Sequence, residues 1–129
     1  MRRIPPPQSL VWEVTARCNL RCGHCYNTWT APGQTLPEEL STDDAMRILV
    51  KVREWANPLN SLTFTGGEPL LRQDLSTLLA AGRSLFPKVQ INLATNGQLL
   101  TLARATEFRS AGVNTMQLSL LSAKPETHE

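Results

Sequence analysis

The chain alternates between short apolar runs and longer segments in which apolar residues recur at helical spacing. The short runs are rich in β-branched residues and are bounded by turn-forming residues, which is typical of strands. Strands are therefore predicted at 9–16, 62–65, 89–94 and 115–120, and helices at about 41–57, 74–86 and 101–111. Strands that alternate with helices predict an α/β fold built on a parallel sheet with right-handed connections.

The first predicted helix has the clearest start. Ser41 or Thr42 is suited to cap it, and Asp43 and Asp44 suit the positive end of the helix dipole. The apolar positions at helical spacing are expected to form its buried face: Ala45, Ile48, Leu49, Val52 and Trp55.

Every unusual short sequence in the chain follows a predicted strand. These sequences are 18–26 after the first strand, 66–69 after the second, 95–97 after the third, and Ser119 near the end of the fourth. Parallel strands end at the same edge of a sheet, and ligands of α/β proteins bind at that edge. The pattern therefore predicts a single site at the carboxyl ends of the strands.

All three cysteines of the chain lie in the first of these loops, as Cys18, Cys22 and Cys25 with the spacing C-x3-C-x2-C. Three soft thiolates on a short polar loop indicate a metal or cluster site. A structural zinc ion needs a fourth ligand, and His24 is poorly placed because it is adjacent to Cys25. A [4Fe–4S] cluster held by three thiolates would leave one iron open to a small molecule.

The composition of the chain indicates the class of protein that carries this site. With 129 residues, 41% hydrophobic and 19% charged, the chain is typical of one modest soluble domain, and its net charge of +2 does not favour nucleic-acid binding. No apolar run approaches the ~20 residues of a membrane span, and residues 1–10 lack the apolar centre of a signal peptide. An odd number of clustered cysteines favours a reducing compartment, so a cytoplasmic location is expected.

The cysteine spacing together with Gly66-Gly67-Glu68-Pro69 resembles the radical S-adenosylmethionine (SAM) enzymes. The resemblance implies a [4Fe–4S] cluster on the three cysteines, with SAM chelating the open iron. It also implies reductive cleavage of SAM to a 5′-deoxyadenosyl radical, which abstracts hydrogen from an organic substrate. The zinc-binding module without catalytic activity remains the alternative of another class.

The same resemblance implies roles for residues in the other loops. Gly66, Gly67 and Glu68 would contact the methionine ammonium of SAM, although two glycines also suit a tight turn. Thr95 and Asn96 would end the third strand on the cofactor side, although Thr-Asn-Gly is also an ordinary turn. The remaining expected cofactor residues are Ser119 at the SAM ribose or carboxylate, His24 near the adenine, and Tyr26.

The segment 122–128 resembles the region after the fourth strand in radical SAM maturases of the SPASM-related group. That resemblance implies a peptide or a tetrapyrrole as substrate, and an electron donor such as a flavodoxin or ferredoxin.

Radical SAM cores have six β/α units in a partial barrel, whereas this sequence predicts four strands. Residues 1–8, with Pro5-Pro6-Pro7, are expected to be an extended lead-in, and 9–129 an incomplete core domain. The expectation is therefore a fragment, a half of a split enzyme whose partner chain carries the missing strands, or an inactive truncated product.

Overall fold

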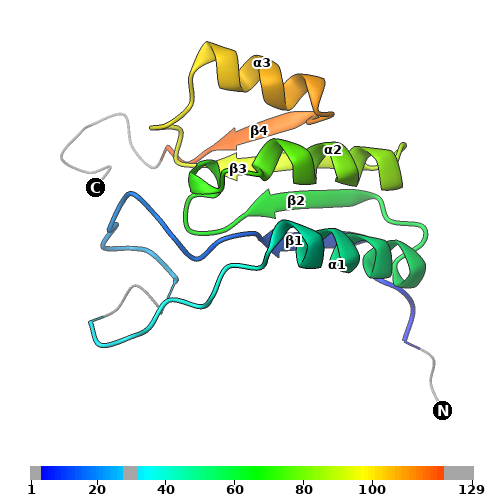
Figure 1. The fold of residues 1–129 in the computed structure, drawn as a ribbon, viewed down its shortest axis with the longest axis horizontal. Helices are drawn as coiled ribbons and strands as arrows, with labels where there is room; N and C mark the ends of the chain where they lie inside the picture. Colours follow the sequence, from blue (N-terminus) through cyan, green and yellow to red (C-terminus); the bar gives the residue numbers. More distant parts are fainter. Residues whose placement is uncertain (1–3, 28–31, 121–129) are drawn as a thin grey trace.

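The computed structural model describes residues 4–27 and 32–120, which form a single parallel sheet with helices on one face (Figure 1). The strands lie in chain order, β1-β2-β3-β4, and every neighbouring pair is parallel. Their bounds are β1 Ser9–Glu13, β2 Ser61–Thr65, β3 Gln90–Thr95 and β4 Thr115–Leu118. The predicted α/β fold with four parallel strands is confirmed.

Three α-helices connect the strands, and a short 3-10 helix follows β2. Their bounds are α1 Thr42–Trp55, η2 Pro69–Leu71, α2 Leu75–Leu85 and α3 Leu102–Ser110. Ser41 caps α1 by accepting a hydrogen bond from the Asp44 amide, as one of the two predicted caps. The 3-10 helix was not predicted from the sequence.

The core lies between the sheet and the helices. Alternate strand residues point toward the helices and are largely buried, among them Leu62 and Phe64 of β2 and Ile91 and Leu93 of β3. The helices cover them with side chains such as Leu49, Leu75, Leu78, Leu79 and Phe108. One face of the sheet is therefore an ordinary apolar core.

The predicted buried face of α1 is wrong at two positions. Ile48 is 37% exposed and Trp55 is 64% exposed, whereas Ala45 and Leu49 are fully buried. Only part of the apolar pattern reaches the core: Ala45 and Leu49 belong to it, and Val52 is partly buried against it. Apolar periodicity alone therefore overestimated the buried width of this helix.

Two predicted strands end earlier than expected. The strand predicted over 9–16 ends at Glu13, because the chain bulges so that Thr15, rather than Val14, accepts from the Gly67 amide. The strand predicted over 115–120 ends at Leu118, after which the Leu120 amide turns back to the Leu118 carbonyl.

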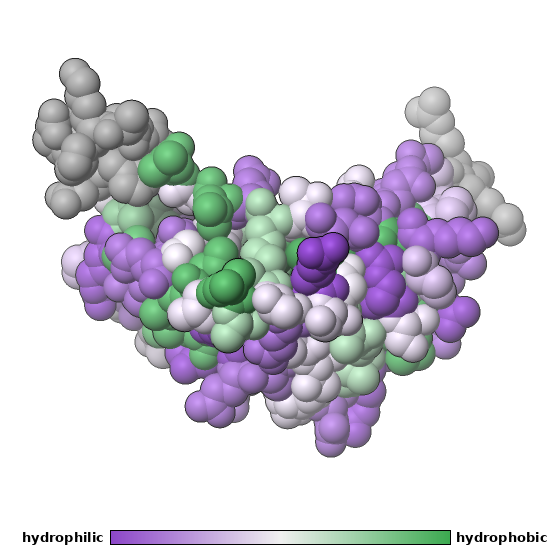
Figure 2. Space-filling view, turned by 90° about the horizontal axis from the view of Figure 1, so that it is seen from above, coloured by the Kyte–Doolittle hydropathy of each residue, from purple (hydrophilic) through white to green (hydrophobic). Residues whose placement is uncertain are grey.

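Within the described ranges, β4 is an edge strand that pairs with β3 alone. Apolar side chains are exposed beside it, at Leu102, Leu118 and Leu120. Figure 2 looks down on this side and shows hydrophobic surface gathered next to the end of the described chain. None of the described helices is long and apolar enough to cross a membrane.

Candidate functional site at the carboxyl edge of the sheet

The loop after β2 runs directly beside the segment that leads into the cysteine loop. The amide of Gly67 donates to the Thr15 carbonyl and the amide of Glu68 donates to the Arg17 carbonyl, both at 2.8 Å. These bonds continue the β1–β2 pairing beyond the strands themselves. The predicted convergence of the two loops at one edge of the sheet is confirmed.

Both glycines of the β2 loop are required by this close approach. A Cβ atom at Gly66 would lie 2.3 Å from the Thr15 carbonyl oxygen, and one at Gly67 would lie 2.4 Å from the Arg17 carbonyl oxygen. Any side chain would therefore push the two loops apart. Neither glycine carbonyl accepts a hydrogen bond from a described residue, so both acceptors are available to a ligand.

Glu68 is fully buried and links the β2 loop to the end of β3. Its Oε1 atom accepts from the Leu70 amide at 3.0 Å and from the Thr95 hydroxyl at 2.6 Å. Its Oε2 atom accepts from the Asn96 amide at 2.8 Å. These hydrogen bonds to the carboxylate hold the loop after β2 against the loop after β3. The Glu68 side chain is therefore engaged within the protein, and the backbone of this segment is the part available to a ligand.

Side-chain amides connect the cysteine loop to the β3 loop. The Asn96 side chain donates to Asn19 at 2.9 Å, and the Asn19 side chain donates to Gln98 at 3.2 Å. Sequence reasoning did not single out Asn19. The position of Asn19 between Cys18 and Cys22 indicated that it belongs to a polar loop. It did not indicate that its partner is Asn96, 77 residues away in the sequence.

A second set of contacts anchors the base of the cysteine loop. Arg17, directly before Cys18, forms a salt bridge with Glu39 at 3.1 Å and donates to the Leu71 carbonyl at 3.2 Å. Both ion-pair partners are partly exposed, so the pair contributes little stability by itself. Its effect is to hold three segments together next to the first cysteine.

Arg72 also holds three segments together, but in the interior, with 2% of its surface exposed. Its guanidinium donates to the carbonyls of Val14 and Leu40 at 2.8 and 2.9 Å and to both carboxylate oxygens of Asp74. Partial burial acts to raise the pKa of Asp74, but hydrogen bonds from Arg72 and Thr42 outweigh it and hold that pKa below its ordinary value. The end of β1 and the starts of α1 and α2 therefore meet at one buried cation.

The three cysteines are free thiols on this anchored loop. Cys18 and Cys22 are half-buried and Cys25 is exposed. The Cys25 amide donates to the Cys22 carbonyl at 3.1 Å, and the Leu20 amide donates to the Cys18 sulfur at 3.4 Å. Among the described side chains, no three His, Cys, Asp or Glu residues are already gathered as a metal site, so the loop must draw its sulfurs together to bind one. The donor set itself, three accessible thiols on one loop, fits an iron–sulfur cluster.

The remaining predicted cofactor residues lie around the same loops. Tyr26 donates to the Glu13 carboxylate at 3.3 Å, and partial burial followed by the Glu13 charge raises its pKa. His24 is exposed on the cysteine loop. Ser119 is exposed just after β4, where its amide donates to the Thr95 carbonyl at 3.0 Å. The segment 122–128 lies outside the described residues.

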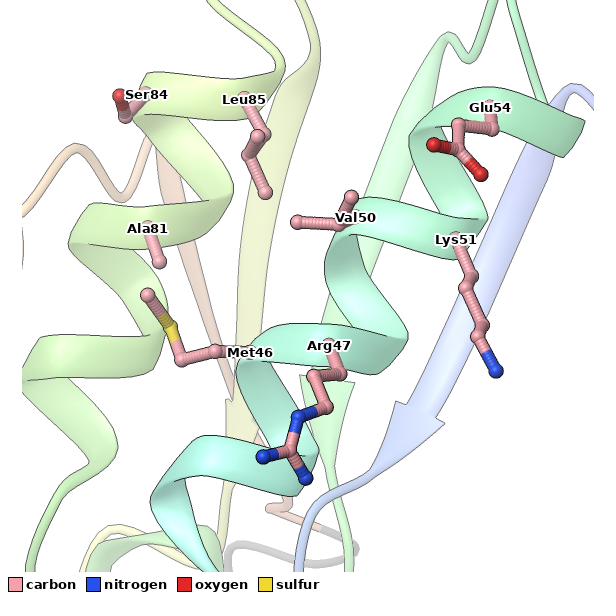
Figure 3. Close-up of a pocket in the computed structure, with 8 residues that line it drawn as sticks. All are labelled: Met46, Arg47, Val50, Lys51, Glu54, Ala81, Ser84 and Leu85. Carbon is pink, nitrogen blue, oxygen red and sulfur yellow. The ribbon is translucent and has the colours of Figure 1, made fainter.

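A groove of about 550 Å³ lies elsewhere, on the outer side of the helical layer. In Figure 3, Val50 of α1 and Leu85 of α2 point toward one another across it. Its lining combines aliphatic and surface charged residues: Met46, Arg47, Val50, Lys51, Glu54, Ala81, Ser84 and Leu85. None of these lining residues was predicted as a site residue.

Comparison with known proteins identifies the family of this chain. The family model described as "Radical SAM superfamily" matches residues 12–129. The chain belongs to the radical SAM superfamily. That family uses a [4Fe–4S] cluster and SAM, and the predicted resemblance is confirmed.

Two curated relatives cover nearly the whole of this radical SAM chain. It is 37% identical over 124 residues to an AdoMet-dependent heme synthase of Methanosarcina barkeri, covering 95% of this chain and 34% of the relative. It is 33% identical over 129 residues to a PqqA peptide cyclase of Granulibacter bethesdensis, covering 100% of this chain and 33% of the relative. The chain therefore spans about a third of the length of these relatives.

A solved structure shows the same fold. SuiB of Streptococcus suis, crystallised with S-adenosylmethionine, is similar to this chain with a TM-score of 0.75 and 26% identity. The match covers 95% of this chain and 27% of SuiB. The expected partial-barrel architecture of the radical SAM type is thereby confirmed for the sheet described here.

Proposed function

We propose that this chain forms the part of a radical SAM enzyme that holds the [4Fe–4S] cluster and the methionine end of SAM. One observation carries the proposal: the cysteine loop is anchored against a two-glycine segment whose carbonyls have no described hydrogen-bond donor. Thiols for iron and acceptors for an ammonium group then lie on adjacent loops of one sheet edge. Family membership supports the cofactors, and the geometry supports the assignment of residues to them.

Cys18, Cys22 and Cys25 are the proposed ligands of three irons. When bound, the cluster and SAM supply a 5′-deoxyadenosyl radical that abstracts hydrogen from the substrate. Arg17 and Asn19 hold the loop on either side of Cys18, through Glu39 and Asn96 respectively. This anchoring keeps the loop at the sheet edge while its sulfurs gather around the cluster.

The carbonyls of Gly66 and Gly67 are proposed to accept hydrogen bonds from the SAM ammonium group. Glu68 holds this segment through its bonds to Thr95 and Asn96, so it acts through the backbone. Asn96 and Ser119 lie on the same edge and remain candidates for the carboxylate or ribose of SAM. His24 and Tyr26 flank Cys25 and are proposed to face the adenosyl part.

The substrate, the electron donor and any second chain are also proposals. A relative named a heme synthase and another named a peptide cyclase support a tetrapyrrole or a peptide as substrate. A flavodoxin or ferredoxin is the proposed source of the electron. The apolar surface beside β4 supports pairing with further β/α units, whether from the same polypeptide or from a partner chain.

The proposal is tested by anaerobic reconstitution of the chain with iron and sulfide, followed by EPR of the reduced protein with and without SAM. We expect a [4Fe–4S]⁺ signal that changes when SAM is added. Cys22→Ala should lose iron, sulfide and the signal, whereas Ser84→Ala, a similar truncation in the groove of Figure 3, should keep all three. A colourless protein that binds one zinc ion would contradict the proposal and support the metal-binding module.

A further inference from the structure

The face of the sheet opposite the helices is polar across all four strands. Apart from Val11 and Ala94, each side chain on this face ends in a hydroxyl, an amide or a carboxylate. The polar members are Ser9, Glu13, Ser61, Thr63, Thr65, Gln90, Asn92, Thr115 and Gln117. None of them is fully buried, because the described helices all lie on the other side (Figure 1).

The polar groups of this face are arranged in rows across the strands. Asn92 donates to Thr63 at 3.3 Å, and Gln90 donates to Thr115 at 3.0 Å. An amide or a hydroxyl has more hydrogen-bonding capacity than one such bond uses, so each row can still bind a polar ligand. The face therefore provides alternating donors and acceptors rather than an apolar wall.

Glu13 is the one charged residue among the described residues of this face. It lies at the carboxyl end of β1, in register with Thr65, on the edge where the cysteine loop begins. The hydrogen bond from Tyr26 to Glu13 places the residue that follows Cys25 over this face. The carboxylate therefore lies at the end of the polar face that is next to the cysteine loop.

We infer that this face recognises a substrate that presents an ammonium group and peptide-like amides, with Glu13 binding the ammonium group. The inference rests on the proposed function and narrows its substrate from the two classes that the relatives suggest to a peptide with an amine. Tyr26 occupies one acceptor position of Oε1, and the exposed carboxylate keeps further acceptor positions for a cation.

A tetrapyrrole with carboxylate side chains matches this face poorly for two reasons. Its carboxylates would meet the like charge of Glu13, and none of the described residues of the face is a lysine or arginine that would offset it. Its apolar macrocycle would cover hydroxyls and amides whose hydrogen bonds with water it cannot replace. Both effects favour the peptide.

Binding is tested by equilibrium dialysis of the full 129-residue chain against three probes, with and without the reconstituted cluster and SAM. Two probes are end-capped peptides that differ only in one residue, Gly-Lys-Gly and Gly-Glu-Gly, and the third is coproporphyrin III, a tetrapyrrole with four carboxylates. One partly exposed charged hydrogen bond predicts about five-fold tighter binding of the lysine peptide than of the glutamate peptide. Coproporphyrin III should bind no better than the glutamate peptide.

Glu13→Gln should remove the preference for the lysine peptide, whereas Glu54→Gln, a matched change on the outer surface of α1, should retain it. Equal or tighter binding of the glutamate peptide or of coproporphyrin III would overturn the inference. So would a preference that Glu13→Gln leaves unchanged, or no binding of any probe. The iron and sulfide content of the same samples tests the proposed function separately. Dialysis of the cluster-free chain measures binding to the polar face without any contribution from the cluster or SAM.

Discussion

The amino ends of the parallel strands form one edge of the sheet and their carboxyl ends form the opposite edge. One arginine binds the loops at each edge, but the two edges differ in the groups that remain available to a ligand. At the amino edge, Arg83 donates to the carbonyls of Gly112, Phe86, Pro87 and Val89 and to the Asn114 side chain. At the carboxyl edge, Arg72 gathers Val14, Leu40 and Asp74 in the interior.

The difference lies in the loops beyond each arginine. The described turns at the amino edge are short, and Arg83 uses their carbonyls. At the carboxyl edge, the loops carry three free thiols and two glycine carbonyls without a described donor. Barrel enzymes likewise separate a stabilising edge from a catalytic edge. We therefore expect changes at the two edges to separate stability from cofactor binding.

Removal of the Glu68 carboxylate should give the largest effect. Glu68→Ala leaves the amides of Leu70 and Asn96 and the Thr95 hydroxyl without their acceptor in a buried place. We expect a loss of roughly 3 kcal/mol or more in the free energy of unfolding, measured by urea denaturation, together with weakened cluster binding.

Glu68→Gln separates the charge of the side chain from its size, because it keeps one acceptor oxygen and removes the charge. Its loss should be intermediate, about 1–2 kcal/mol. If Glu68→Ala were as stable as the wild type, the carboxylate would not be the link between the two loops.

A side chain at Gly67 should separate the β2 loop from the cysteine loop. The new Cβ of Gly67→Ala would lie 2.4 Å from the Arg17 carbonyl oxygen, so overpacking should cost about 1–3 kcal/mol. The cluster yield after reconstitution should fall with it. Gly23→Ala is the matched control within the cysteine loop, since its Cβ meets nothing within 4 Å, and it should change stability by less than about 0.5 kcal/mol. Equal effects of the two substitutions would refute the close-approach argument.

Loss of the arginine at the amino edge should affect stability alone. Arg83→Ala removes the donor shared by the carbonyls of Gly112, Pro87 and Val89, which we expect to cost about 2 kcal/mol. The folded fraction should still show the SAM-dependent EPR change. Loss of that change at full cluster content would mean that the two edges are not separate.

The smallest expected effect is a pH dependence at Asp74. Its pKa in the folded chain lies below the ordinary value of 3.8, so its stabilising contribution is complete above that value and is lost as the pH falls through the folded-state pKa. Stability of the wild type should therefore fall more steeply in acid than stability of Asp74→Asn. Urea denaturation between pH 7 and pH 3 measures this difference, with the exposed Asp43→Asn as control.

The sequence predicted the order of the elements because the apolar spacing is regular and each loop carries clear turn residues. It also predicted that the loops with the unusual sequences meet at one edge of the sheet, since these sequences follow the strands directly. It did not predict the 3-10 helix, because Pro69-Leu70-Leu71 has no helical period in three residues. It placed Ile48 and Trp55 in the core because apolar character does not show how wide a contact will be.

The contacts that hold the site together could not be predicted, because their partners are distant in sequence and ordinary in type. The motif predicted that Glu68 belongs to the segment at the SAM ammonium, but it did not indicate that its carboxylate accepts from Thr95 and Asn96. Nothing local to Asn19 indicates that it pairs with Asn96 and Gln98. A motif identifies the chemistry of a loop, and only the folded chain shows which side chains are used to position it.

Hydrogen–deuterium exchange of the reconstituted chain, with and without SAM, tests the central claim most directly. We predict that SAM slows exchange in the carboxyl-edge segments 14–27, 66–71 and 95–98 and leaves the amino-edge segments 86–89 and 112–114 unchanged. Protection at the amino edge, or no protection in the segment of Gly66 and Gly67, would contradict the assignment of this edge as the cofactor site.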